Sequence, residues 1–469
     1  MARTPTRPFH GERTNAYLSW AAVFLAILVG LRGLSVGQVH DVVFAASVVL
    51  VALIPVLVLE SRRAALPWEI PMLAVLPLIG AGLAPDPFSR QIALYVGAAP
   101  IALALTLELN AFTEIRLERW LAVSFVTMLS AALAAAWATT AWSRDLVTGT
   151  AVIPSNEHVM WLLIASTGAG LLAGIVFDRY YRQFPGEELV SAPVDGIDEE
   201  LFAAKTDADE HPNLEERLPL ASRHQRQLVW AMRAGLVAII VYGILTFEFD
   251  AIGNVTAMLA ISFLPTLLRR RYDLPFDAGL TLWITLAVFL HAIGSYRLYE
   301  LTFWWHNLTH PLSATLVGAI GYLVIRVLDE RRDDIHLPPR LVPAFVVLFV
   351  VAFGVFWEIG EFGFDVVAAH TGLTMPLAQH GLDDTMTDLV FNTVGAVVVA
   401  TWGLPYLTDL TDDVSDRLEG WSLLEHESTD DRESSGEHSS ADDRETLGDR
   451  ESPADRETLG DRETPGDHD

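Results

Sequence analysis

The sequence predicts an all-α protein: a polytopic bundle of about twelve transmembrane helices, within a range of ten to twelve, followed by a disordered acidic tail. The chain of 469 residues is 51% hydrophobic and has a mean hydropathy of +0.34. That is too apolar for a soluble protein with so many charges unless the two are segregated. They are segregated, since apolar runs alternate with short polar turns as far as residue 404, a pattern typical of polytopic helical membrane proteins.

Each expected span is an apolar run bounded by polar or aromatic residues. The first six lie at 17–31, 42–59, 68–83, 92–107, 120–142 and 159–177. The other six lie at 234–247, 251–268, 278–295, 312–328, 341–360 and 386–404. Several runs are close to the shortest length that crosses a bilayer, so ten or eleven spans remain open. The first run is interpreted as a retained span, because no small-residue cleavage site follows it.

The arginines predict how the spans are oriented. If the N-terminus is cytoplasmic, the inner turns hold most arginines, including Arg269, Arg270 and Arg271, and each outer turn holds at most one. Such an asymmetry sets orientation by the positive-inside rule. We therefore expect a multi-pass protein of the cell (plasma) membrane, with both termini cytoplasmic and the lipid bilayer as its partner.

The charge is concentrated in two polar segments. The net charge is −28; residues 409–469 hold 22 acids and six arginines, and residues 183–225 hold 11 acids and three bases. The low-complexity composition of the tail, with its degenerate Asp-Arg-Glu repeat, predicts disorder. We expect an N-terminal six-span half at 1–179, an acidic cytoplasmic linker at 180–227, a C-terminal six-span half at 228–408 and a disordered acidic tail at 409–469.

Composition also excludes some classes of function. The chain has no cysteine, which excludes disulfides and thiolate metal sites. The surplus of acids predicts no nucleic-acid partner, because the phosphate backbone would be repelled. With Lys205 as the only lysine, the acidic composition resembles that of halophilic, haloarchaeal membrane proteins; the simpler interpretation is an acidic tail alone. Protein partners are not predicted.

Acidic side chains gather at one expected surface of the C-terminal half. Glu358 and Glu361 are expected at the outer end of one span, and Asp384 and Asp388 at the outer start of the last. Spacings of three and four place the members of each pair on one helix face. The topology brings His310 to the same surface, which completes the candidate cluster. Weaker candidates are Asp383, Asn392, His291 and His306.

Like charges at these spacings repel each other, so something should offset them. A proton, a histidine, the positive end of a helix or a divalent cation can do so. Oxygen ligands with one or two histidines suit Mg, Mn or Ca, and a histidine-containing subset suits Zn. The expected metal ligands are Glu361, Asp384, Asp388 and His310.

Simpler interpretations of the same residues remain open. Asp383 or Asp384 can cap the start of a helix, and Glu358 can make an interhelical hydrogen bond. His291 can be a packed histidine.

Two motifs in this region resemble a known family. The run Trp357-Glu358-Ile359-Gly360-Glu361-Phe362 and the acidic run Gly381–Leu389 are similar to motifs of the YjdF-type family of uncharacterised inner-membrane proteins. His310, and His291 with Gly294 and Tyr296, match further family positions. The resemblance covers residues 277–404, although the second motif lacks the family's Trp. It implies a functional site without naming a reaction.

Three classes of function remain open. The cluster can support metal-assisted hydrolysis of a lipid-linked or phosphorylated substrate, which would make the protein an enzyme. It can capture cations or protons for an ion or solute transporter, although transporter sites usually lie near mid-membrane. It can also lock helices together in a structural or sensory protein. We favour an integral membrane protein of unknown activity whose outward-facing cluster binds a divalent cation or protons.

Overall fold

The computed structural model describes residues 13–181, 220–247, 249–272, 276–294, 302, 304–332, 334–371, 379, 381–403, 407–408 and 411. Most of the expected linker and nearly all of the expected tail therefore lie outside the described residues. The chain divides into two compact units, 1–414 and 415–469, and the first contains everything described here. The described residues are helical, and their one β-bridge, between Arg116 and His336, is isolated.

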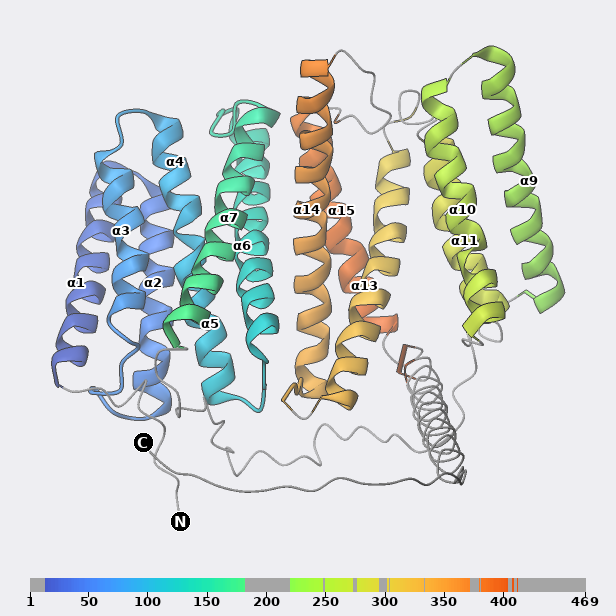
Figure 1. Ribbon diagram of the computed structural model, residues 1–469. Coiled ribbons are helices and arrows are strands. Elements are labelled where there is room, and N and C mark those ends of the chain that lie inside the picture. Colours follow the sequence, from blue (N-terminus) through green and yellow to red (C-terminus); the bar gives the residue numbers. More distant parts are fainter. Residues whose placement is uncertain are drawn as a thin grey trace, which may run out of the picture. The chain divides into compact units, whose positions relative to one another are not determined.

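The N-terminal half consists of helices joined by short turns (Figure 1). They are α1 (Arg13–Val36), α2 (Val39–Val58), α3 (Glu69–Leu83), α4 (Pro87–Val96), α5 (Ala98–Phe112), α6 (Arg119–Thr148) and α7 (Asn156–Tyr181). Helices α4 and α5 follow each other as one apolar segment interrupted at Gly97. The ring of Phe44 packs so closely there that a Cβ on Gly97 would lie 2.3 Å from it.

The described residues of the C-terminal half also form helices. They are α9 (Ser222–Thr246), α10 (Phe249–Tyr272), α11 (Ala278–Ile293), α13 (Trp305–Arg331), α14 (Val342–Thr371) and α15 (Leu382–Val398). A 3-10 turn at Pro339–Leu341 precedes α14, and a π-helical turn at Val399–Gly403 extends α15.

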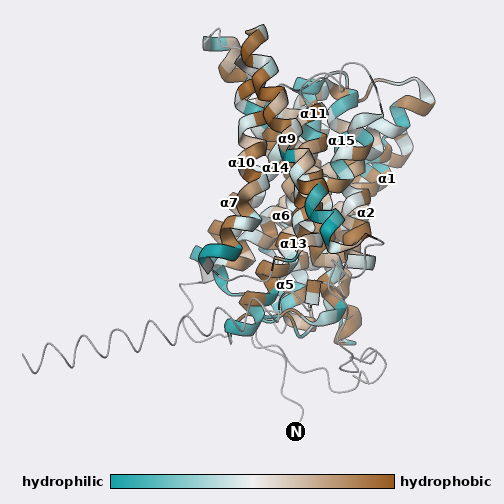
Figure 2. Cartoon of the chain, turned by 90° about the vertical axis from the view of Figure 1, so that its right-hand side faces the viewer, coloured by the Kyte–Doolittle hydropathy of each residue, from teal (hydrophilic) through white to brown (hydrophobic). Residues whose placement is uncertain are grey.

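The predicted fold class is confirmed. Ten segments among the described residues are long and apolar enough to cross a membrane, and the two shorter apolar helices are α3 and α11. Hydrophobic residues predominate along the helices (Figure 2), and large apolar side chains such as Leu172 and Leu245 are exposed on their outer faces. These faces suit a lipid environment, in which apolar side chains need no cover.

Several helices extend beyond the predicted apolar runs, among them α9, which begins at Ser222, and α14. The expected span at 341–360 is part of α14, which has 30 residues and ends at Thr371. A helix of that length measures about 45 Å, whereas the hydrocarbon core is about 30 Å thick. Hydropathy falls after Gly360, but helix formation continues, so the apolar run marked the membrane portion and not the helix end.

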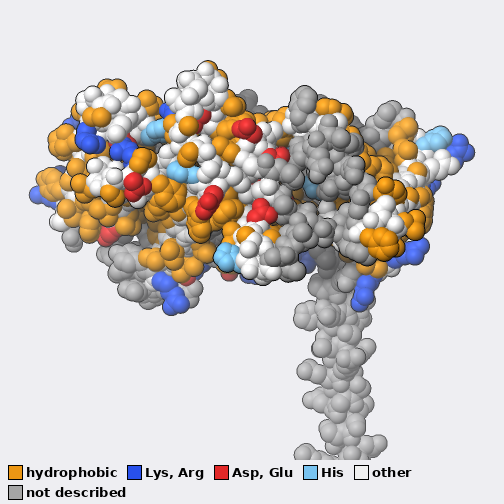
Figure 3. All heavy atoms as spheres, turned by 90° about the horizontal axis from the view of Figure 1, so that it is seen from above, with side chains coloured by type: hydrophobic (Ala, Val, Ile, Leu, Met, Phe, Trp, Pro, Cys, Tyr) orange, Lys and Arg blue, Asp and Glu red, His pale blue; other side chains and the backbone are white. Residues whose placement is uncertain are grey.

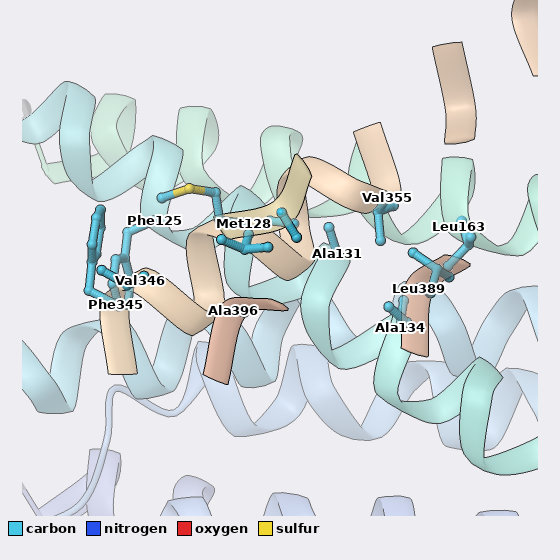
Figure 4. Packing of buried hydrophobic residues seen from close by; sticks show 14 of the residues in the cluster. Phe125, Met128, Ala131, Ala134, Leu163, Phe345, Val346, Val355, Leu389 and Ala396 are labelled. Atoms are coloured by element: carbon cyan, nitrogen blue, oxygen red, sulfur yellow. The ribbon is translucent and has the colours of Figure 1, made fainter. Parts of the chain in front are cut away.

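The largest core cluster contains residues from both halves of the chain (Figure 4). Phe125, Met128 and Ala131 of α6 pack in it with Val346 of α14 and Ala396 of α15. Helices α9, α10 and α11 pack mainly against one another and reach the rest through α11 and α13. There the indole of Trp305 donates to the carbonyl of Leu290 at 3.0 Å. Helices α13–α15 pack against one another, and α14 and α15 also pack against α6 and α7.

Polar contacts distinguish the two ends of this packed group. At one, which we name the arginine end, Arg116 pairs with His336 through the backbone, and Arg332 and Arg340 form ion pairs with Glu118 and Glu114. At the other, the carboxylate end, the indole of Trp142 donates to Asp383 at 2.8 Å and the amide of Asn156 donates to Gln379 at 2.6 Å.

Candidate functional site

Glu358 is the most enclosed of the predicted site residues. Glu358 belongs to α14, and the residue is 1% exposed. The side-chain amide of Gln379 donates to the Glu358 carbonyl and to Oε2, both at 3.0 Å. Oε1 is buried without a hydrogen-bond partner among the described residues. Glu361 and Asp388 lie close enough to act on this carboxyl electrostatically.

His310 and Asp388 form the closest acid–base contact of the cluster. His310 Nε2 lies 3.2 Å from Asp388 Oδ1, and both side chains are largely buried. The ring of His291 approaches the ring of His310 edge-on, with centroids 6.3 Å apart. Helices α11, α13 and α15 therefore meet at these three residues, as the topology predicted.

A glycine lets α13 and α15 approach so closely. A Cβ on Gly395 would lie 2.4 Å from the carbonyl oxygen of Pro311 and 2.7 Å from the Cβ of Ala314. Asn392, another predicted residue, packs α15 on α14, since its Nδ2 would lie 3.1 Å from a Cβ on Gly354. Small residues at helix interfaces allow this type of close packing in membranes.

Two further carboxylates, Glu361 and Asp383, accept hydrogen bonds from tryptophan indoles. Trp357 donates to Glu361 at 2.9 Å, one turn along α14, and Trp142 of α6 donates to Asp383. The N-cap residue of α15 is Gly381, at φ 112°. Asp383 and Asp384 therefore do not occupy the N-cap position. They lie in the first turn, where the helix dipole favours negative charge.

Sequence reasoning missed Gln379. This residue joins two helices, because its Oε1 accepts from Asn156 of α7 while its Nε2 donates to Glu358 of α14. Its backbone N–H donates to Asp365 at 3.0 Å, which fixes the chain beside α14. A single glutamine before a helix carries no periodic or spacing signal, so the sequence alone could not have found it.

The described residues of the predicted site lie at one end of the helices, and a metal centre is not shown there. Acidic and histidine side chains are spread over this end (Figure 3). No group of three or more His, Asp or Glu among the described residues is arranged to hold a metal ion. The ligand set of Glu361, Asp384, Asp388 and His310 therefore stays a prediction. His306 lies in α13, and its side chain is outside the description.

We expect Gln379→Ala to lower the free energy of unfolding by about 1–3 kcal/mol, because it leaves a buried carboxylate oxygen of Glu358 without its donor. Thermal unfolding in detergent measures the change. Thr401→Ala is the control: Thr401 is exposed and bonds only within its own helix turn, and should change stability by less than about 0.5 kcal/mol. Equal melting of the two variants would contradict the role given to Gln379.

Comparison with known proteins finds similarity over the C-terminal half and over a short N-terminal segment. Residues 228–409 match a family described as "Predicted membrane protein (DUF2238)", and residues 5–65 match a "Domain of unknown function (DUF8268)". The first match confirms the YjdF-type resemblance and extends it to α9 and α10, which the motifs did not reach. The match agrees with an integral membrane protein, associated with the lipid bilayer, whose function is unknown.

One curated relative is an uncharacterized protein of Thermotoga maritima. It is 31% identical over 121 residues, which cover 25% of this chain and 58% of that protein. The chain therefore matches just over half the length of this relative. No solved structure matches the chain.

Proposed function

We propose that this integral membrane protein binds protons at its carboxylate end, through Glu358 and the Asp388–His310 pair. One observation carries the proposal: a carboxyl that is 1% exposed, with one oxygen unpartnered among the described residues, lies beside an acid–base pair contributed by two other helices. Intramembrane acids are costly and, where they occur, commonly serve proton or ion relays.

Charge balance favours a proton on Glu358. The groups that face it are Glu361 on its own helix, Asp388 on α15 and His310 paired with Asp388 on α13. Three ionised carboxylates against one imidazole would leave excess negative charge in a low dielectric. A proton on Glu358 removes one charge and makes its unpartnered oxygen a donor. The buried Thr385 side chain lies beside this carboxyl and, like the amide of Gln379, can hydrogen-bond to its ionised form.

The arginines support a direction for proton access. Arg116, Arg332 and Arg340 lie at the arginine end, opposite the cluster. By the positive-inside rule that end is cytoplasmic. The carboxylate end of a cell-membrane protein would then face outward, and external protons would reach Glu358 first.

Labelling with a hydrophobic carbodiimide tests the proposal, because this reagent modifies protonated carboxyls in apolar surroundings. We expect modification of Glu358 that falls as the pH rises and is absent from Glu358→Gln. Asp86 is the internal control. The backbone N–H and the hydroxyl of Ser89 donate to it and hold the pKa of Asp86 below its usual value, so it stays ionised and unlabelled. An unlabelled Glu358 at all pH values would refute the proposal.

Metal analysis separates protons from divalent cations. The purified protein should contain no stoichiometric Mn, Zn, Mg or Ca that disappears in both Glu361→Gln and Asp388→Asn. Such a metal, lost from both variants, would replace the proton proposal with a metal site and justify a screen of lipid phosphates as substrates.

A structural role is the second candidate, and one observation favours it. The Trp142–Asp383 and Asn156–Gln379 hydrogen bonds join α6 and α7 to the segment around α15. If the cluster only locks helices together, Asp388→Asn and Glu358→Gln each lower the melting temperature by an amount that does not change with pH. A proton site instead predicts that the penalty of each variant changes with pH.

A further inference from the structure

Arg233 is a buried arginine inside a membrane helix, remote from the carboxylate cluster. It lies in the middle of α9 and is 4% exposed. Its Nη2 donates to the carbonyl of Ser262 and, at 3.3 Å, to the hydroxyl of Thr266, both on α10. The guanidinium carbon lies 4.1 Å from the ring centre of Phe263 and 5.4 Å from that of Trp230. Hydrogen bonds therefore fix Nη2, and the two aromatic rings contact the guanidinium through cation–π interactions.

The rest of the guanidinium has donors to offer. Both hydrogen bonds to described residues use Nη2, and Nε is buried without a partner among them. Helix α9 contains no acid. The acid of α10, Asp250, belongs to its first turn, far along the helix from Ser262. No described carboxylate forms an ion pair with Arg233. A buried charge without a counter-ion is strongly unfavourable, so an anion bound beside Arg233 would be stabilising.

The position of Arg233 indicates where an anion would come from. It lies seven residues beyond Arg226, about 10 Å deeper along the helix, and Ser262 precedes Arg269 by the same number. Because α9 and α10 are antiparallel neighbours, Arg223 and Arg226 lie at the same end as the triplet Arg269–Arg271. The guanidinium is thus about 10 Å deeper along the helices than the arginines at these helix ends. Trp230, beside the guanidinium, is 62% exposed on the lipid-facing surface.

We propose that Arg233 binds the phosphate of an anionic membrane lipid between α9 and α10. The guanidinium presents a rigid fork that matches two phosphate oxygens. The arginines at the helix ends attract the headgroup over a longer range, and Trp230 and Phe263 provide contact for the apolar part of the lipid. No residue of the carboxylate cluster takes part, so this site is independent of the proton proposal.

Native mass spectrometry of the delipidated full-length protein tests the proposal. The probes are phosphatidylglycerol, phosphatidylcholine and inorganic phosphate. We expect one phosphatidylglycerol to bind at least tenfold more tightly than phosphatidylcholine, and Arg233→Gln to lose this preference. Thr266→Val, which removes a neighbouring hydroxyl and keeps the charge, should retain it. Arg233→Lys should weaken it several-fold, because an ammonium lacks the fork.

Salt separates Arg233 from the exposed arginines. In about 1 M salt, where the Debye length is about 3 Å, the preference should persist in the parent and in Arg269→Gln/Arg270→Gln. Equal affinities for the two lipids, or an unchanged preference in Arg233→Gln, would overturn the proposal. Inorganic phosphate bound as tightly as the lipid would also overturn it, in favour of a free-phosphate site. If Arg233→Gln does not fold, the comparison of Arg233→Lys with Thr266→Val decides.

Discussion

Asp41→Ala is expected to lower the free energy of unfolding by about 3–5 kcal/mol, the cost of leaving a largely buried charge unpaired. Arg90 Nη2 contacts both carboxylate oxygens of Asp41, at 2.5 and 2.6 Å, and its Nη1 donates to the carbonyl of Ala81 at 3.1 Å. The Asp41 side chain is 1% exposed. The ion pair joins α2 to α4, and the Arg90–Ala81 hydrogen bond joins α4 to α3, so losing the ion pair weakens the packing of these helices. Thermal unfolding in detergent gives the change.

Two comparisons sharpen this prediction. Glu118→Gln breaks an ion pair with Arg332 in which the arginine is exposed, and exposed pairs contribute about 0–1 kcal/mol. Replacing both buried partners with apolar side chains, as in Asp41→Leu/Arg90→Met, should restore much of the stability lost in Asp41→Ala. If Asp41→Ala is no less stable than Glu118→Gln, then Arg90 has found another partner or water.

Gly395→Leu is expected to destabilise the packing of α13 on α15 by about 3 kcal/mol, the upper end of typical overpacking costs. Its Cβ would meet the backbone of Pro311 and the Cβ of Ala314 at 2.4–2.9 Å, and neither can rotate away. Moving the helices apart lengthens the contact between His310 and Asp388. Carbodiimide labelling of the variant should therefore lose its dependence on pH along with stability.

Gly360→Leu is the matched control on α14. A Cβ there meets nothing within 4 Å, and the residue is exposed. Because glycine is the weaker helix former by about 1 kcal/mol, this variant should be as stable as the parent or more so. If Gly395→Leu behaves in the same way, then α13 and α15 do not depend on close approach at this point.

The sequence predicted the helices better than their ends or partners. Apolar runs identify spans because a bilayer requires about 20 apolar residues. They do not identify the extension of α14 to Thr371, where the chain remains helical after it becomes polar. They also do not distinguish a buried helix face from a lipid-facing one, since both are apolar. For that reason the packing of α6 against α14 could not be predicted from the apolar runs.

The candidate site was predicted in part. Topology placed Glu358, Asp388 and His310 at one end, and alternating spans were enough to infer this. The partners that fix them were not predictable: Gln379 reaches Glu358 from outside the helix, and Trp142 comes from a helix 241 residues away from Asp383. The contact of Arg90 with Asp41 was not predictable either, because it depends on how α2, α3 and α4 pack together.

The shared core has a consequence for biogenesis. Helix α7 ends at Tyr181 and α13 begins at Trp305, so the ribosome adds more than a hundred residues between them. At about 5–20 residues per second this takes roughly 6–25 s. During that interval lipid must cover the small-residue face of α6, including Ala131 and Ala138, which α13–α15 later help to cover. Synthesis order thus makes the junction of the two halves a late step of assembly, after α9–α11 have entered the bilayer.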